Sequence, residues 1–275
     1  MKPDVAGFVL AAGSGTRLRP LTTLRPKALC PVNNRALVDY AVDRCASLSS
    51  RVRVNAWHLS DQMRAHFEER DDLDAHLQGV ADLAVESEPL GTAGALGANR
   101  DWIDGAAVLV HNADAWHADP IDDFVETWDG ERVRLLVTPT NEDADFGDRR
   151  FCGVSLMPWK LVEGFKAEPS GLWEVLWRHL RLEEIDLVDI DGAYFDCGTP
   201  ADYLDANMAA SGGESVVSPH AQVEGSVERS VVWPGAHVGP KEVLVDSIRA
   251  TDEITVDAKR SKSADVASLS EAFTR

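Results

Sequence analysis

A glycine-containing loop and two basic residues near the N-terminus have the types and the spacing needed to bind a polyanion. The loop consists of Leu10, Ala11, Ala12, Gly13, Ser14, Gly15 and Thr16. Glycines allow backbone N–H groups to approach phosphate oxygens closely. Arg17 follows two residues after the second glycine, and Lys27 lies between Pro26 and Pro31, which we expect to hold it in an extended segment. These features together predict a phosphate-binding site.

This loop matches neither of two common nucleotide-binding motifs. No Gly-Lys-Ser/Thr sequence ends it, so it is not a Walker P-loop. The dinucleotide fingerprint needs a third glycine where this chain has Leu18. Because a Gly-x-Gly pair alone is often only a tight turn, the predicted phosphate site depends on Arg17 and Lys27 as well.

Two aspartates each follow an apolar segment that we predict to be a strand. Asp114 comes after Val108–Val110, and Asp196 comes directly after Tyr194 and Phe195. Strand ends of an open α/β sheet direct side chains into its ligand site. The alternative roles are a helix N-cap for Asp114 and a turn acid before glycine for Asp196.

Short apolar runs alternate with amphipathic stretches along the first two hundred residues. The expected strands contain Val5–Leu10, Val52 and Val54, Val108–Val110, and Leu135–Val137. Helical spacing predicts one helix over Leu37–Leu48 and another that Ser60 caps and that carries Met63 and Phe67. This alternation predicts a doubly wound, mostly parallel α/β sheet of the Rossmann-like type.

The pattern changes after about Asn207, where Ser211, Gly212 and Gly213 resemble a linker. Apolar residues then recur every six positions, first at Val217 and Val223 and again at Val232, Val238 and Leu244. A six-residue period with turn residues predicts a short left-handed β-helix-like segment; the alternative is an irregular β-rich tail. Fewer than three repeats rarely stand alone, so the segment should pack on the main domain or on another chain. The expected divisions are 1–210, 211–250 and a polar tail, 251–275.

The composition limits the classes of partner. The chain has 27 basic and 46 acidic residues and a formal charge of −19. This charge argues against general affinity for nucleic acid or an anionic membrane surface. Any polyphosphate site must therefore gather its own cations against a repulsive background.

Cysteine usage and the N-terminus indicate a cytoplasmic protein. Cys30, Cys45, Cys152 and Cys197 lie far apart and lack the spacing of a structural zinc site. The apolar run Val5–Ala12 is too short to span a bilayer and lacks the layout of a signal peptide. We therefore expect reduced cysteines in the cytoplasm.

Five motifs occur in the order typical of one enzyme family. They are LAAGSGTRLRPLT from Leu10, RPKALCPV from Arg25, EPLGTAGAL from Glu88, NAD from Asn112, and FDCGTP from Phe195. With these motifs the first three-quarters of the chain resembles the sugar-1-phosphate nucleotidyltransferases, also called NDP-sugar pyrophosphorylases. Several motifs in order are more specific than any one of them.

The resemblance implies a role for each motif. The loop Leu10–Thr16 would wrap a nucleoside triphosphate, with Arg17 on its outer phosphates. Lys27 would bridge the α-phosphate and the incoming sugar phosphate. Asp114 and Asp196 match the two carboxylates that hold Mg²⁺, the expected cofactor.

The resemblance also implies how the base and the sugar would bind. Gly91, Thr92 and Gly94 would lie against the nucleobase and its ribose, and Gly153 and Glu174 would contact the acceptor sugar. A solvated helix face is the alternative for Glu174, and a sharp bend is the alternative for Gly153. The chain lacks the Glu-Lys-Pro segment that supplies a further phosphate lysine in many relatives, and the candidate substitutes are Lys160 and Lys166.

The substrate pair is the least constrained part of the prediction. The segment that begins at Glu88 is most similar to mannose-1-phosphate guanylyltransferases and to relatives acting on heptose phosphates, which favours GTP with mannose 1-phosphate. The alternative is UTP with a hexose 1-phosphate or N-acetylmuramate 1-phosphate, because the stretch from Val54 to Leu59 resembles those uridylyltransferases.

Two further hypotheses are less favoured. A non-catalytic regulatory subunit would be expected to have lost Arg17, Lys27, Asp114 or Asp196, and all four are present. An acyltransferase site needs a longer repeat than this chain has. We expect the repeat to mediate homo-oligomerisation instead, with neither nucleic acid nor membrane as a partner.

Overall fold

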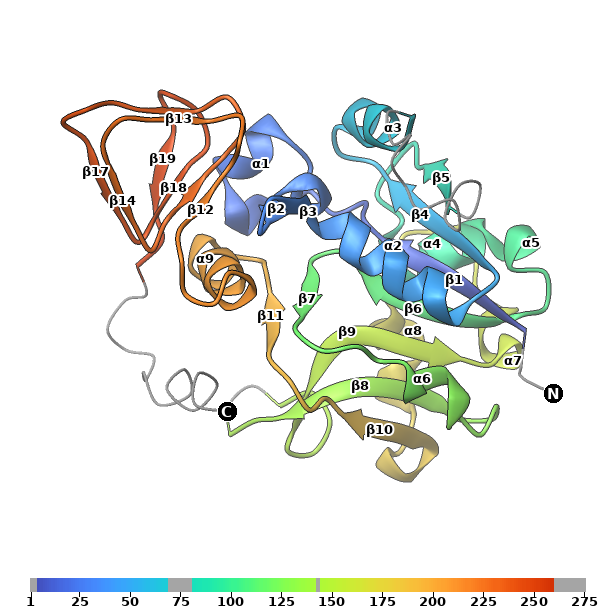
Figure 1. The fold of residues 1–275 in the computed structure, drawn as a ribbon. Helices are drawn as coiled ribbons and strands as arrows, with labels where there is room; N and C mark the ends of the chain where they lie inside the picture. Colours follow the sequence, from blue (N-terminus) through green and yellow to red (C-terminus); the bar gives the residue numbers. More distant parts are fainter. Residues whose placement is uncertain (1–3, 69–80, 142–143, 260–275) are drawn as a thin grey trace.

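A seven-stranded sheet forms the centre of the computed structural model, which describes residues 4–68, 81–141 and 144–259 (Figure 1). The strands lie in the order β10 (Ile185–Asp189), β8 (Val133–Pro139), β9 (Arg149–Met157), β6 (Ala107–Asn112), β1 (Val5–Leu10), β4 (Arg51–Ala56) and β5 (Ala81–Val85). Only the two pairs made by β9 are antiparallel within this sheet. The predicted fold class, a mostly parallel α/β sheet, is therefore confirmed.

The strand order reverses beside β1. From β1 the chain adds β4 and β5 on one side and then crosses to β6 on the other. Both β4 and β6 are parallel to β1, and Leu10 pairs with Asn112 at the carboxyl ends of β1 and β6. Such a reversal opens a crevice between the two loops that leave the strands, and ligands of open α/β sheets bind there.

Both faces of the sheet are buried, as expected for parallel strands. Along β1, Val5 and Val9 face one apolar core, whereas Ala6 and Phe8 face the other. The first core is covered by α2 (Leu37–Leu48), whose Val38, Ala41, Val42 and Cys45 recur at helical spacing. The second core is covered by α4 (Gly91–Ala98). The predicted strand at Val5–Leu10 and helix at Leu37–Leu48 have these bounds in the structure.

The other elements of this part are short. The helices are α1 (Leu21–Leu24), α3 (Ser60–Glu68), α5 (Arg100–Ile103), α6 (Asp123–Glu126), α7 (Trp159–Val162), α8 (Leu172–Val175) and α9 (Pro200–Ala210). Single turns of 3₁₀-helix are η1 (Thr16–Leu18), η2 (Lys27–Leu29), η3 (Trp177–His179) and η4 (Leu182–Glu184), and the small strands are β2 (Pro31–Val32), β3 (Arg35–Ala36), β7 (Ala115–His117) and β11 (Tyr194–Asp196). Ser60, predicted as a cap, is the first residue of α3, and Met63 is buried as expected. Among the residues described, no helix is long and apolar enough to cross a bilayer.

The C-terminal repeat forms a small coil, seen as a triangle in Figure 1, whose stacked strands pair in parallel except for the last pair, which is antiparallel. Its strands are β12 (Val216–Val217), β13 (Gln222–Val223), β14 (Ser226–Glu228), β15 (Val231–Val232), β16 (His237–Val238), β17 (Val243–Val245), β18 (Ser247–Arg249) and β19 (Thr255–Asp257). The two predicted runs stack on each other, with Val217 opposite Val232 and Val223 opposite Val238. The β-helix-like segment is thus confirmed. Residues 260–275 of the predicted tail lie outside the described residues.

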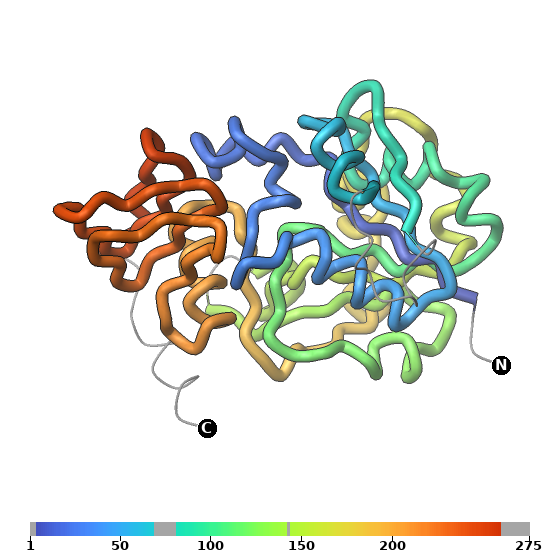
Figure 2. Tube along the Cα trace, turned by 45° about the horizontal axis from the view of Figure 1, so that its top comes forward, coloured from blue at the N-terminus to red at the C-terminus, as the bar shows by residue number. Residues whose placement is uncertain are grey.

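The coil packs on α9 and on the segment that contains Lys27 (Figures 1 and 2). Trp233 of the coil is fully buried, and its Nε1 donates to the hydroxyl of Tyr203 on α9 at 3.0 Å. That hydroxyl donates in turn to the carbonyl of Pro31. The Arg25 guanidinium lies 4.3 Å from the centre of the Trp233 ring, within the range of a cation–π contact. The repeat therefore packs against the segment Arg25–Val32 and stabilises its position.

Tyr203→Phe should lower the free energy of unfolding by about 1–3 kcal/mol, because it leaves the buried Trp233 N–H and Pro31 carbonyl without their partner. Urea denaturation measures the loss. Tyr40→Phe is the matched control, since the Tyr40 hydroxyl also donates to a carbonyl, that of Val32, but at a partly exposed position. Equal losses of unfolding free energy in the two variants would mean that the linked hydrogen bonds of Trp233, Tyr203 and Pro31 stabilise the fold no more than one ordinary hydrogen bond does.

Candidate active site

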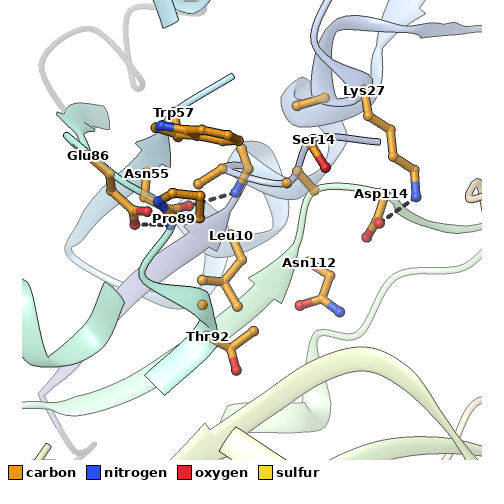
Figure 3. Close-up of a pocket in the computed structure, with 16 residues that line it drawn as sticks. Leu10, Ser14, Lys27, Asn55, Trp57, Glu86, Pro89, Thr92, Asn112 and Asp114 are labelled. Carbon is orange, nitrogen blue, oxygen red and sulfur yellow. Dashed lines mark hydrogen bonds and ion pairs between the residues drawn. The ribbon is translucent and has the colours of Figure 1, made fainter. Parts of the chain in front are cut away.

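A cavity of about 410 Å³ lies at the carboxyl ends of β1 and β6, where the strand order reverses (Figure 3). It is lined by Leu10, Ala11, Ala12, Gly13, Ser14, Lys27, Ala28, Asn55, Trp57, Glu86, Pro89, Gly91, Thr92, Asn112, Ala113 and Asp114. In Figure 3 Trp57, Asn55 and Glu86 lie at one end, and Lys27 and Asp114 lie at the other. The cavity therefore has a flat aromatic end and a charged end.

Two buried polar side chains that were not predicted as site residues fix the wall of this cavity. The Asn55 amide oxygen accepts from the Ala11 N–H at 2.7 Å, and its amide nitrogen donates to Glu86 Oε1 at 2.7 Å. The other Glu86 oxygen accepts from the Leu90 N–H at 3.1 Å. Asn55 is 2% exposed and Glu86 9%. This network ties the glycine loop to the segment leading into α4, so the two walls of the cavity are held at a fixed spacing.

The glycine loop turns sharply at Gly15, which has a φ of +60°. A Cβ atom there would lie 2.7 Å from the Thr22 methyl group and 3.2 Å from Lys27 Cβ. The Thr22 hydroxyl donates to the Gly15 carbonyl at 2.8 Å. The turn therefore needs glycine, both for its backbone conformation and for its close packing beside Lys27.

Lys27 lies in a 3₁₀ turn, from which its side chain reaches the cavity. The prediction that Pro26 and Pro31 hold Lys27 in an extended segment is therefore wrong. The residues before and after the turn, Pro26 and Cys30, are extended, and the Cys30 N–H donates to the Lys27 carbonyl at 2.9 Å. The Lys27 side chain is only 10% exposed. Its Nζ lies 2.6 Å from Asp114 Oδ2 and 3.5 Å from Asp196 Oδ1.

The two carboxylates keep Lys27 charged. Burial by itself would lower the pKa of the ammonium group, but the nearby charges of Asp114 and Asp196 and the hydrogen bond to Asp114 outweigh burial, and the pKa is raised. A lysine with a raised pKa cannot serve as a base near neutral pH. It is instead a fixed positive charge that a phosphate oxygen could approach.

A two-stranded ribbon brings Asp196 to Asp114. Strand β11 pairs antiparallel with β7, so that Asp196 lies opposite Ala115, and the Cys197 N–H donates to the Asp114 carbonyl at 3.0 Å. The predicted placement of both aspartates at strand ends agrees with this geometry. Thr199 then caps α9 and accepts from the Asp202 N–H, which fixes the chain directly after Asp196.

Arg17 approaches the same cluster from the solvent side. Its Nη2 lies 3.4 Å from Asp196 Oδ2, and its side chain is 65% exposed. A Cβ atom on Gly198 would lie 2.6 Å from the guanidinium, so glycine at this position allows the approach. The arrangement places two cations and two carboxylates within one small region of an acidic protein.

The pair Asp114 and Asp196 fits the requirements of Mg²⁺. One oxygen of each carboxylate lies close to the Lys27 ammonium group, so the two carboxylates are neighbours. No group of three or more His, Cys, Asp or Glu side chains suited to a metal occurs among the residues described. Mg²⁺ needs no such group, because it commonly takes one or two carboxylates together with phosphate oxygens and water.

The remaining predicted site residues do not all line the first cavity. Gly91 and Thr92 line the cavity, but Gly94 does not; a Cβ atom there would lie 2.2 Å from the Glu168 carbonyl oxygen. Gly94 thus allows α4 to pack closely on the segment 166–170. Gly153 has a φ of +80° and packs against Asn112 and Ala115, where a Cβ atom would be 2.5 Å from that of Ala115.

Glu174 lines a second cavity, which adjoins the first. Of the two candidate phosphate lysines, Lys160 forms an ion pair with Glu131, and the Lys166 backbone packs against Gly97. Neither lysine lines either cavity. Among the described residues that line the first cavity, Lys27 is therefore the only basic one, and Arg17 lies nearby through its contact with Asp196.

Buried neutral groups surround the turn that carries Asp114. His111 and His117 are fully buried, with ring centres 5.3 Å apart, and His117 Nε2 lies 2.8 Å from the Cys152 carbonyl oxygen. Burial holds the pKa of His111 well below its usual range and lowers the pKa of His117 to about 4. Burial also raises the pKa of the Cys30, Cys45 and Cys152 thiols to about 12, so none of these three is a thiolate nucleophile.

The sequence profile of the nucleotidyl transferase family matches residues 6–151, from β1 into β9, and includes the glycine loop, Lys27 and Asp114. The chain belongs to this family. The resemblance found in the sequence is thereby confirmed, and the match ends before Asp196.

Curated members of the nucleotidyl transferase family are similar to this chain at low identity. It is 36% identical to N-acetylmuramate alpha-1-phosphate uridylyltransferase of Caulobacter vibrioides over 157 residues, covering 53% of this chain and 62% of that protein. It is 22% identical to mannose-1-phosphate guanylyltransferase 1 of Arabidopsis thaliana over 272 residues, covering 85% of this chain and 74% of that protein.

Solved structures share the fold of this family member. A Bacillus anthracis protein in complex with sucrose superposes with a TM-score of 0.63 at 20% identity, covering 75% of this chain and 95% of the other. HddC from Yersinia pseudotuberculosis superposes with a TM-score of 0.59 at 18% identity, covering 74% and 97%. These similarities support the arrangement of sheet and helices.

The free energy of unfolding should fall as the pH is lowered from about 6.5 to about 4. Unfolding releases His111 and His117 to their ordinary pKa of 6.5, so the unfolded state binds protons in this range and the folded state does not. For His117 alone the loss is about 3 kcal/mol. Urea denaturation at several pH values measures this loss of unfolding free energy. The loss between pH 6.5 and pH 4 should be smaller in His117→Asn than in the wild-type protein. An identical pH dependence in the variant would contradict a buried neutral His117.

Proposed function

We propose that the protein transfers a nucleotidyl group from a nucleoside triphosphate to a sugar 1-phosphate, with release of pyrophosphate. The observation that carries the proposal is the convergence of Lys27, Asp114 and Asp196 beside the glycine loop, at the carboxyl edge where the strand order reverses. Membership of the nucleotidyl transferase family supports it. The retention of all three residues, and of Arg17, argues against a non-catalytic subunit.

The proposed reaction joins two anions. A phosphate oxygen of the sugar 1-phosphate attacks the α-phosphorus, the bond from that phosphorus to the bridging oxygen of the β-phosphate breaks, and pyrophosphate leaves with the electron pair. Nucleophile and leaving group are both ionised near neutral pH, so no general base is needed. Alignment and neutralisation of charge therefore dominate the barrier.

Each residue of the cluster has a proposed task in this reaction. The glycine loop offers backbone N–H groups to the triphosphate, and the exposed Arg17 binds its outer phosphates. Lys27, held nearly immobile by burial, bridges the two reacting phosphates. We propose that Asp114 and Asp196 hold Mg²⁺, which when bound would neutralise phosphate charge.

For the substrates we propose GTP and mannose 1-phosphate. The support is the Glu88 motif and an alignment with a mannose-1-phosphate guanylyltransferase that extends over 85% of this chain. UTP with N-acetylmuramate 1-phosphate is the second candidate, because a uridylyltransferase of that name is 36% identical. We also propose a division at 1–210, 211–250 and 251–275, in which the start of the last part, Thr255–Asp257, pairs with the coil. Association through the C-terminal coil and a cytoplasmic location belong to the same proposal.

Pyrophosphate release, measured with Mg²⁺ across the common nucleoside triphosphates and a panel of sugar 1-phosphates, tests the reaction. We expect a response to GTP with mannose 1-phosphate that EDTA abolishes. A response only to UTP with N-acetylmuramate 1-phosphate would establish the second candidate. Silence across the whole panel, from folded protein, would contradict the proposed function.

Asp114→Asn should lower turnover by about 100- to 1000-fold, because it removes one of the two charges proposed to hold the metal ion. Circular dichroism should show an unchanged fold. Asp101→Asn, at an exposed position on α5, is the matched control and should keep full activity. Undiminished turnover in Asp114→Asn would remove Asp114 from the metal site.

A further inference from the structure

A second cavity of about 260 Å³ adjoins the first and shares Leu10, Thr92 and Asn112 with it. In Figure 3 Thr92 and Asn112 lie on the side of Leu10 away from Trp57. A molecule whose phosphate meets the α-phosphate at Lys27 could extend its other end into this second cavity. If the proposed function holds, that end is the sugar of the acceptor.

Two residues that line the second cavity each have a buried polar side-chain atom that finds no hydrogen-bond partner among the described residues. Ser155, on β9, is 1% exposed, and its hydroxyl makes no hydrogen bond. Trp177, in η3, is 8% exposed, and its indole N–H is likewise unpaired. Both residues line the cavity. Unpaired buried polar groups cost free energy, so their presence together at one cavity indicates a ligand that pairs with them.

The charges around this cavity are one-sided. Glu174 is the only ionisable side chain among its lining residues, which all belong to the described part of the chain. Two basic residues near it are directed elsewhere. Arg178 Nε lies 3.3 Å from His179 Nε2, and Arg150 precedes Phe151 on β9 and so points to the opposite face of the strand. A carboxylate placed in this cavity would meet Glu174 without a compensating cation.

The apolar part of the lining is aromatic. The rings of Phe151 and Trp177 pack edge-to-face with centres 4.9 Å apart, and Trp173 also lines the cavity. A sugar ring has apolar C–H faces and hydroxyl groups that both donate and accept. Such a group could cover the aromatic rings, accept from Trp177 and donate to Glu174, and it could pair with Ser155 in either sense.

We propose that this cavity selects acceptors whose sugar is uncharged, with Trp177 and Ser155 as specificity residues, and that it rejects sugars bearing a carboxylate. The inference rests on the proposed nucleotidyl transfer and narrows its acceptor. It favours neutral hexose 1-phosphates over N-acetylmuramate 1-phosphate, whose sugar carries an acid.

Matched acceptors that differ in one group test the selection. Mannose 1-phosphate and mannuronic acid 1-phosphate, or glucose 1-phosphate and glucuronic acid 1-phosphate, are compared with the same nucleoside triphosphate. We expect kcat/KM to be at least about 100-fold higher for the neutral member of the pair that reacts. An acidic sugar that reacts as well as or better than its neutral partner, N-acetylmuramate 1-phosphate included, would overturn the inference.

Variants test the named residues. Trp177→Phe keeps a ring but removes the N–H, and we expect the KM for the sugar 1-phosphate to rise about 10-fold while the KM for the nucleotide stays unchanged. Ser155→Ala should act in the same direction. Glu174→Gln should reduce the preference for the neutral acceptor about 10-fold, whereas Glu183→Gln, at an exposed site on η4, should not. Unchanged sugar KM in both Trp177→Phe and Ser155→Ala would refute their role.

Failure of this inference differs from failure of the proposed function. Pyrophosphate release with a preference for an acidic sugar refutes only the inference. If no acceptor reacts, calorimetric titration of the wild-type protein with the same matched pairs decides the selectivity of the cavity without turnover. Tighter binding of the neutral sugar 1-phosphate, weakened by Trp177→Phe, would then support the inference, and equal or tighter binding of the acidic sugar would overturn it.

Discussion

The candidate site depends on one buried ammonium group held between two carboxylates. In a protein with a net charge of −19, a triphosphate can bind only where local cations exceed the surrounding negative charge. Asp114 and Asp196 keep Lys27 protonated in a site that burial alone would favour neutral. Lys27 in turn allows two carboxylates to approach each other at strand ends. Without it these acids would repel one another, and with it they lie side by side where we propose that a metal ion and phosphate oxygens bind.

Three separate parts of the chain must therefore meet at this point, and the fold has a distinct device for each. The reversal of strand order places Asp114 beside the glycine loop. The ribbon of β7 and β11 carries Asp196 to it. The third part is the 3₁₀ turn of Lys27, which is backed by α9 and, through Tyr203 and Trp233, by the C-terminal coil. The coil thus contributes to the site without lining it, because it buries the outer surface of the segment that positions Lys27.

Much of this arrangement could be predicted from the sequence, because the deciding signals are local. Periodicity located β1, α2 and the repeat, and motif order identified the family. The side-chain network could not be predicted, since Asn55 and Glu86 are single polar residues with no pattern, and their pairing depends on the register between β4 and β5. Gly94 was predicted to face the nucleotide but faces the 166–170 segment, because the same lack of a side chain serves close packing equally well. Ser155 and Trp177 carry no sequence signal; only a structure shows that a cavity joins them.

Lys27 and its two carboxylates are proposed to direct attack on the α-phosphorus. The most direct measurement follows a radioactive phosphate through the reaction, with the label placed in the nucleoside triphosphate either at the α- or at the γ-position. We expect α-label to appear in the NDP-sugar and γ-label in pyrophosphate, and Lys27→Met to slow both transfers in parallel. Transfer of γ-label to the sugar phosphate, or an unchanged rate in Lys27→Met, would contradict this proposal.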